Sequence, residues 1–290
     1  MKTKYSIFII AMVFIVACGP QKKSDSQESE KQASASEKME PELTKVWETD
    51  TVLTTCESVL YYPEEDVLYV SNIAGKPTDQ DGVGFISKLN TDGDIENLKW
   101  VEGLDAPKGM GILDNQLYVT NINELIAINL SDGSIAERYV VDGAQFLNDV
   151  AIGEGKVFFS DMNTGKIHVL ENGEITTVAE GRDGVNGLAH DGNKLYALDQ
   201  QGLNHFGMET PVVLNSEITG GDGLIIVNDT TYIASRWKGQ IFLALGGETH
   251  LLLDTNESSQ TADIGFIPEE NLVLVPTFFS NKVEAYKLEY

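Results

Sequence analysis

The chain has 290 residues, and its 45 acidic residues outnumber its 20 Lys and Arg residues to give a formal charge of −25. This acidic excess argues against binding to nucleic acid and against adhesion to anionic lipid, because both need clustered positive charge. Only two cysteines are present, so we expect neither a disulfide scaffold nor a Cys-rich zinc module. The length fits two ordinary domains or one large all-β domain.

A lipoprotein signal is predicted at the start of the chain. Lys2 and Lys4 precede an apolar run over residues 5–17, which is shorter than the roughly 20 residues that span a bilayer. The run ends in Ile-Val-Ala before Cys18 and resembles the lipobox of bacterial lipoproteins, in which this cysteine is lipidated. The alternative is an ordinary signal with a chance cysteine. We predict that residues 1–17 are removed and that a lipid on Cys18 holds the protein at the bacterial cell envelope.

A disordered tether is predicted next, over residues 18–42 including the lipidated cysteine. Residues 19–42 consist mainly of Ser, Gln, Glu, Lys and Ala, with too little apolar surface to fold. As a flexible coil this segment would reach about 27 Å. The protein would stand on an outer membrane, facing the periplasm or the surface. We expect a monomer that touches the membrane only through its lipid, takes a small-molecule substrate and binds no nucleic acid.

A sequence unit recurs six times in residues 43–290. In each unit a polar residue begins an apolar stretch, and a turn and a second apolar strand follow. The lead residues are 51, 40, 38, 36 and 41 positions apart, which is the period of a four-stranded propeller blade. Asp-Gly, Asn-Gly or Gly-Gly pairs in most units are the residues that tight hairpin turns require. The six lead residues are Glu57, Lys108, Asn148, Asn186, Asp222 and Asp263.

The repeat predicts an all-β, six-bladed β-propeller with four antiparallel strands per blade. We expect residues 44–48 to pair outside residues 283–288 and thereby close the ring. The innermost strand of each blade lines the central channel, so the lead residues should meet at one mouth. The long segment over residues 73–84 is the best candidate for a lid over this mouth.

Four of the lead residues offer oxygen ligands, and they are Glu57, Asn148, Asn186 and Asp222. Hard divalent cations prefer such oxygens, which favours calcium first, then magnesium or manganese. Zinc is less favoured, because the set contains no His or Cys. The alternative is that these side chains only bond strand ends or water. Two carboxylates facing one channel are nevertheless costly without a counter-ion.

Three further charged residues are candidates for the site. Lys108 could stand where a cation otherwise sits, bind an anionic substrate group and act in catalysis, or pair with Asp263. Two unit positive charges about 4 Å apart repel by roughly 4 kcal/mol at an effective dielectric near 20, so a charged Lys108 would weaken metal binding. Asp263 and Arg236 are candidates for substrate binding, although for Arg236 the interpretation as an ordinary loop residue is favoured.

The lead residues of the first five units are Glu, a variable residue, Asn, Asn and Asp. This order resembles the pattern of the gluconolactonase and regucalcin (senescence marker protein) family. The resemblance spans residues 43–290 and rests on Glu57-Ser58, Leu147-Asn148-Asp149, Val185-Asn186-Gly187-Leu188 and Gly221-Asp222-Gly223. It implies that Glu57, Asn186 and Asp222 are metal ligands and that Asn148 approaches the metal or the substrate. The metal would polarise a lactone carbonyl and hold the attacking water, and Asp222 would act as general base.

Two functions from different classes follow from these patterns. One is a metal-dependent hydrolase of a lactone or related small sugar ester. The other is a non-catalytic, envelope-anchored propeller that binds a small ligand or a protein partner, since fold alone does not decide function. The sequence contains no nucleophile elbow, phosphate-binding loop or His-Glu-x-x-His motif, so serine hydrolases, nucleotidases and zinc proteases have no support.

Overall fold

The computed structural model describes residues 39–206, 211–255 and 259–290. The predicted signal peptide, Cys18 and almost all of the tether lie outside the described residues, so the lipid anchor and the envelope location stay predictions. None of the described helices has the length and apolar character needed to cross a membrane.

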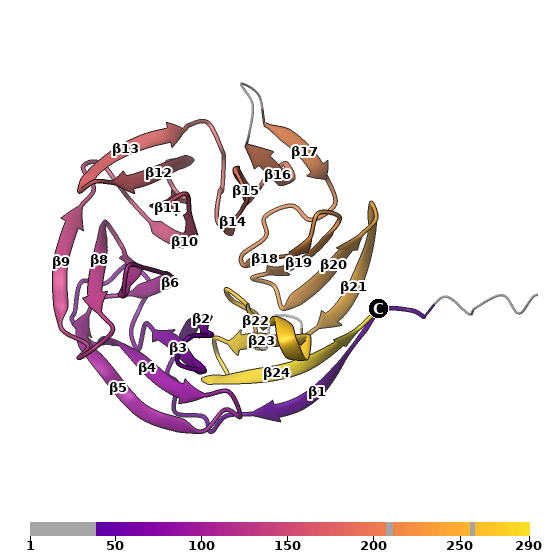
Figure 1. The fold of residues 1–290 in the computed structure, drawn as a ribbon, viewed down its shortest axis with the longest axis horizontal. Coiled ribbons are helices and arrows are strands. Elements are labelled where there is room, and N and C mark those ends of the chain that lie inside the picture. The colour runs from indigo at the N-terminus through magenta and orange to yellow at the C-terminus, as the bar shows by residue number, and fades with distance from the viewer. Residues whose placement is uncertain (1–38, 207–210, 256–258) are drawn as a thin grey trace, which may run out of the picture. The chain divides into compact units, whose positions relative to one another are not determined.

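The described residues form six four-stranded antiparallel sheets, arranged around a centre as the blades of a propeller (Figure 1). This confirms the predicted fold. The first blade consists of β2 (Cys56–Tyr62), β3 (Val67–Asn72), β4 (Gly84–Asn90) and β5 (Ile95–Leu104). The second consists of β6 (Pro107–Leu113), β7 (Gln116–Asn121), β8 (Glu124–Asn129) and β9 (Ile135–Val140). The third consists of β10 (Leu147–Gly153), β11 (Lys156–Asp161), β12 (Lys166–Glu171) and β13 (Glu174–Ala179).

The remaining blades follow the same order from the centre to the rim. The fourth consists of β14 (Leu188–Asp191), β15 (Lys194–Asp199), β16 (Gly202–Phe206) and β17 (Val212–Asn215). The fifth consists of β18 (Leu224–Asn228), β19 (Thr231–Arg236), β20 (Gln240–Leu245) and β21 (Glu248–Asp254). The sixth consists of β22 (Gly265–Ile267), the 3-10 helix η2 (Pro268–Glu270), β23 (Leu272–Thr277), β24 (Lys282–Glu289) and β1 (Glu42–Glu48).

The ring closes between β1 and β24, as the sequence predicts. The two strands are antiparallel, with Thr44 opposite Lys287 and Glu48 opposite Glu284. Four alternating charges reinforce this joint, because Lys45 and Lys282 each lie within 2.9 Å of both Glu48 and Glu284. The first and last strands of the propeller are therefore tied by backbone and side-chain bonds, and the outermost strand of the sixth blade comes from the other end of the domain.

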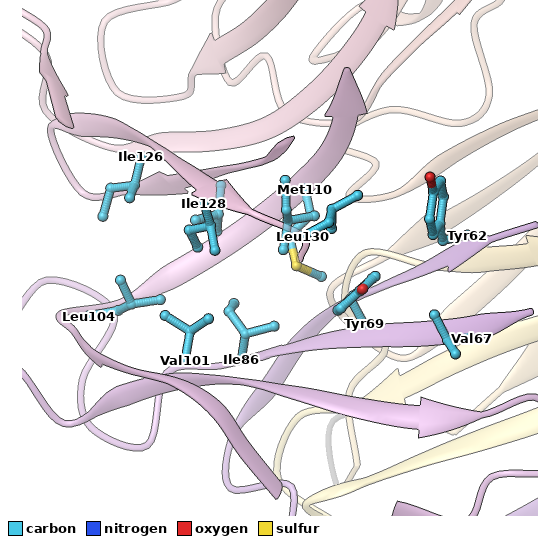
Figure 2. Close-up of a cluster of buried hydrophobic side chains, with 12 residues drawn as sticks. Tyr62, Val67, Tyr69, Ile86, Val101, Leu104, Met110, Ile126, Ile128 and Leu130 are labelled. Atoms are coloured by element: carbon cyan, nitrogen blue, oxygen red, sulfur yellow. The ribbon is translucent and has the colours of Figure 1, made fainter. Parts of the chain in front are cut away.

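Apolar layers fill the space between neighbouring blades. Figure 2 shows the layer between the first and second blades, where Tyr69 and Ile86 face Met110 and Ile126. Burial of each such side chain contributes about 1.5–3 kcal/mol, so the interfaces between sheets supply much of the stability of the domain. Because the apolar layers lie between the blades, the strand ends at the mouth of the channel can have polar residues without loss of this packing.

A polar residue at the end of the second strand of several blades fixes the segment that enters the innermost strand. Asn121 Oδ1 accepts hydrogen bonds from the backbone N–H groups of Asp105 at 3.0 Å and Ala106 at 2.8 Å. The Asp161 carboxylate accepts the N–H groups of Gln145 and Phe146, both at 3.0 Å. These bonds hold the residues just before Lys108 and Asn148, so the repeat positions the lead residues through their own loops.

Cys56 is a buried free thiol at the start of β2, and its Sγ donates to the Lys282 carbonyl at 3.3 Å. Burial raises its pKa to about 12. Because only the thiolate is nucleophilic, we expect Cys56 to react about a thousandfold more slowly with thiol reagents than an exposed cysteine at pH 8. A thiol titration of the Cys18→Ser protein should show no reaction until guanidinium unfolds it. Rapid labelling in native buffer would contradict the burial of this thiol.

Candidate functional site

The starts of the innermost strands bring five predicted residues to one cavity of about 400 Å³. These residues are Glu57, Lys108, Asn148, Asn186 and Asp222. All five are buried, with exposed fractions between 1% and 9%. They come from five different blades, so the closed ring itself assembles the floor of the cavity.

Backbone bonds fix the two lead residues that stand just ahead of their strands. The Asn186 N–H donates to the Leu198 carbonyl at 2.9 Å, and the Asp222 N–H donates to the Ser235 carbonyl at 2.8 Å. Each bond extends the pairing between the first and second strands of its blade. The side chains therefore project into the cavity from a fixed backbone, and Asn186 Nδ2 donates to Asp222 Oδ1 at 2.7 Å.

Two oxygens in the floor of the cavity are buried without a hydrogen-bond donor among the described residues. They are Glu57 Oε2 and Asn186 Oδ1. Leaving such groups unpaired costs about 1–3 kcal/mol each, and more where the group is charged. The Asn186 amide already uses its nitrogen on Asp222, so its oxygen is the end that remains available. This pair of oxygens calls for a cation or another donor in the cavity.

Burial and mutual repulsion dominate the electrostatics of the site. Burial, together with the charges of Asp222 and Asp263, raises the pKa of Glu57 well above its usual range. Burial also raises the pKa of Asp222 to about 7, against the opposing effect of the Asn186 hydrogen bond. The pKa of Lys108 falls to about 8 because of burial, although the Glu57 charge opposes this shift. Carboxylates in such a site hold their charge at neutral pH most readily when a further cation joins them.

Lys108 is held as a cation inside the cavity. Its Nζ donates to the backbone carbonyls of Ala106 at 2.9 Å and Pro77 at 3.3 Å, and lies 4.6 Å from the centre of the Phe146 ring. In the described part of the chain no ion pair joins Lys108 to Asp263, which was one of the three expected roles. Its bond to Pro77 also ties the loop over residues 73–84, the expected lid, to the floor of the cavity.

Asp263 occupies the sixth lead position but does not line the cavity as the structure describes it. Its Oδ2 accepts a hydrogen bond from Ser58 Oγ at 2.5 Å, and its backbone N–H donates to the Glu57 carbonyl at 2.8 Å. These bonds join the sixth blade to the first directly behind Glu57. The structure thus places Asp263 as a support for a candidate ligand, at a position where the sequence favours substrate binding.

Asp149 belongs to the same buried layer, and the sequence patterns do not single it out as a site residue. Its carboxylate accepts the N–H groups of Val150 and Leu188, both at 2.6 Å, and so ties the third blade to the fourth. A Cβ at Gly109 would come within 2.5 Å of Asp149 Oδ1, so the second blade approaches this carboxylate as closely as backbone allows. Burial raises the pKa of Asp149 well above its usual value. Its only sequence signal is its place directly after Asn148.

Arg236 lies outside the cavity lining in the described residues. Its guanidinium donates to the Thr219 carbonyl at 3.0 Å, the Glu217 carbonyl at 3.1 Å and Gln240 Oε1 at 2.9 Å, and packs over the Phe242 ring. The bonds to Thr219 and Glu217 hold the loop before Asp222, whereas Gln240 and Phe242 anchor the guanidinium to strand β20. They match the interpretation of Arg236 as a loop residue, and they place it as a positioning group for that lead residue.

Apolar side chains form the upper wall of the cavity, and sequence periodicity gives no signal for most of them. They are Ile73, Pro77, Phe146, Met162, Trp237 and Phe278. These residues lie in loops and strand ends at different distances from the lead residues of their units, so a repeat pattern does not align them. The sequence offers one other signal for these wall residues. They are large apolar residues in segments that are expected to be exposed loops.

The donor set of the floor fits a hard divalent cation. Within the described residues no three His, Cys, Asp or Glu side chains gather as a metal-binding group. Two carboxylates, Glu57 and Asp222, instead stand beside two amides, Asn148 and Asn186. Amide and carboxylate oxygens are the usual ligands of calcium, and two oxygens of this set receive no hydrogen bond from the part of the chain that the structure describes.

Comparisons with known proteins establish the fold of this chain. No protein-family model matches the sequence, and no curated protein matches it. A gluconolactonase from Xanthomonas campestris has a similar structure, with a TM-score of 0.59 and 14% identity over 82% of this chain and 88% of that one. A catalytically inactive variant of virginiamycin B lyase from Staphylococcus aureus, solved with quinupristin, is also similar. Its TM-score is 0.54 and its sequence identity is 14%, over 86% of this chain and 100% of that one. The predicted likeness to a gluconolactonase is therefore confirmed for the propeller fold.

Proposed function

We propose that this chain is a divalent-metal-dependent hydrolase, with calcium the preferred ion, that opens a lactone or related small sugar ester. The observation that carries the proposal is the pair of buried, unpartnered oxygens, Glu57 Oε2 and Asn186 Oδ1, beside Asp222 in one cavity. The structural similarity to a gluconolactonase supports it at the level of the fold. Glu57, Asn148, Asn186 and Asp222 would hold the ion.

The residues of the cavity have separate roles in this reaction. A bound ion supplies Lewis-acid polarisation of the ester carbonyl. Asp222, which a bound ion would keep in its charged form, would take a proton from the attacking water. The water oxygen bonds to the carbonyl carbon, the ring C–O bond breaks, and the proton passes to the departing oxygen to give a hydroxy acid. The Lys108 ammonium, fixed by two carbonyls, stabilises the negative oxygen that develops.

One observation favours the non-catalytic alternative. Lys108 already places a positive charge in the cavity, and the Glu57 charge acts on it. A propeller that uses this lysine as its resident cation would bind a small ligand or protein partner without hydrolysing it. The two functions differ in whether a metal ion is needed.

Chelation and a lactone panel test the proposal. We expect a chelator to lower the melting temperature and to stop hydrolysis, with activity restored by excess calcium, magnesium, manganese or zinc in that order of preference. An ion at a hundred times its Kd stabilises the folded state by about 2.7 kcal/mol, which corresponds to roughly 5–10 °C for a domain of this size. Hydrolysis that continues unchanged in the presence of the chelator would contradict the proposed metal dependence. A melting temperature that the chelator leaves unchanged, together with no turnover of any lactone, would support the binding alternative.

A further inference from the structure

The cavity has two chemically different parts. The polar residues of the floor lie at the strand starts, whereas the wall above them is apolar. The polar side chains outside the floor are Asn163 and Gln200, from the third and fourth blades. The opposite side, formed by the fifth, sixth and first blades, presents Trp237, Phe278 and Ile73.

The apolar side of the wall is a supported surface. Phe278 and Ile73 belong to a buried cluster with Ala106 and Ile122, and Trp237 packs against it. The Trp237 and Phe278 rings meet edge to face, with centroids 4.6 Å apart and planes at 74°. Such packing fixes the aromatic rings, so the surface is ready for a ligand before binding.

The aromatic surface continues beyond the cavity. The Phe279 ring lies 5.1 Å from Phe278 and 6.2 Å from Trp237, and 57% of this residue is exposed. Because Phe279 is exposed and adjoins the cavity wall, an apolar ligand could remain in contact with aromatic rings from the cavity to its opening. A short polar ligand would leave this surface uncovered.

A polyhydroxylated ligand suits the wall poorly. Each hydroxyl placed against an apolar surface loses its hydrogen bonds to water without replacement, which costs binding. The side of the cavity formed by Trp237, Phe278 and Ile73 contributes no polar side chain among the described lining residues. A lactone ring with one apolar substituent avoids this loss, because only its ester group needs the polar floor.

From this geometry we infer that the preferred substrate is a lactone with an apolar alkyl or aryl substituent, which packs on the Trp237 ring and extends toward the exposed Phe279 while the ester lies over the floor. Phe278 and Ile73, only 4% and 1% exposed, support this surface from behind. This inference rests on the proposed hydrolysis, and it narrows the substrate from small sugar esters to apolar lactones. Trp237 is the residue that we expect to set specificity. It forms the edge between the cavity and the exposed Phe279.

A homologous series of γ-lactones tests this inference on the full chain. We expect kcat/KM to rise about fourfold for each added side-chain methylene until the wall is covered, and to exceed the value for glucono-δ-lactone. Trp237→Ala should flatten this dependence, while Trp237→Phe should keep most of it. Trp100→Ala is the matched control, because it removes the same ring from strand β5 at the rim and should leave the dependence intact.

Separate outcomes bear on the inference and on the proposed function. Faster turnover of glucono-δ-lactone than of the alkyl lactones, or an equal loss for all substrates in Trp237→Ala, would overturn the apolar preference. If no lactone is hydrolysed with any metal, the proposed hydrolysis fails, and binding of the same series is then measured by isothermal titration calorimetry. Affinity that rises with chain length and is lost in Trp237→Ala would uphold the apolar surface, and its absence would overturn it.

Discussion

Replacing Asp222 with Asn is expected to lower lactone hydrolysis by about 10²–10⁴-fold while the propeller stays folded, because a positioned general base contributes a factor of this size. The amide keeps the shape of the side chain and an oxygen for the ion, but it does not take a proton from water. Steady-state kinetics with excess calcium measure the change. Asp132→Asn is the control, since this carboxylate lies on an exposed hairpin turn and, among the described residues, accepts hydrogen bonds from Ser134 alone. Unchanged kcat in Asp222→Asn would remove Asp222 from the reaction.

The same variant should alter how stability depends on pH in the presence of a chelator. Burial raises the pKa of Asp222 from 3.8 to about 7, so its contribution to folding is complete below about pH 4 and is lost as the pH rises through 7. The native protein should therefore melt at lower temperature at pH 8 than at pH 5. Asp222→Asn should lose less stability over this interval. Identical pH profiles would show that Asp222 keeps an ordinary pKa.

Ring geometry explains why the fold and the floor of the site could be predicted from the sequence. Hairpin turns have residues with positive φ at fixed places in the repeat, as at Asn172 and Gly173, with φ of 52° and 81°. These turns and the spacing near 40 residues determine where each innermost strand begins. A residue at that point lines the cavity in five of the six blades, so Glu57, Asn148 and three other lead residues could be predicted without any contact information.

The wall and the supporting layer depend on contacts that a repeat does not encode. Asp263 shares its repeat position with Asp222, but its carboxylate accepts a hydrogen bond from the Ser58 hydroxyl of the next blade and does not line the cavity. Phe146 and Phe278 occupy different positions in their units and meet the cavity only after the ring closes. The positions of such residues depend on contacts with neighbouring blades. A repeat in the sequence does not show which blade packs against which loop.

Replacing Lys108 with Met is expected to tighten calcium binding at least tenfold at pH 7. The substitution keeps most of the volume and removes a charge from the cavity that holds the proposed ligands. At an effective dielectric near 20, a unit charge repels a divalent ion by more than the roughly 1.4 kcal/mol of a tenfold change at any separation below about 20 Å, so tenfold is a modest expectation. Competition with a calcium dye measures the affinity. Lys238→Met, an exposed change in the loop beside Trp237, controls for long-range charge.

The pH dependence separates a repelling lysine from a merely structural one. Burial lowers the pKa of Lys108 from 10.5 to about 8, so its contribution to folding is present above pH 10.5 and is lost as the pH falls through 8. Native calcium affinity should rise between pH 7 and 9, as Lys108 loses its charge and the carboxylates gain theirs. In Lys108→Met the rise above pH 8 should disappear, because the variant has no ammonium that loses its charge in this range. Weaker calcium binding in this variant would mean that the ammonium helps to build the metal site.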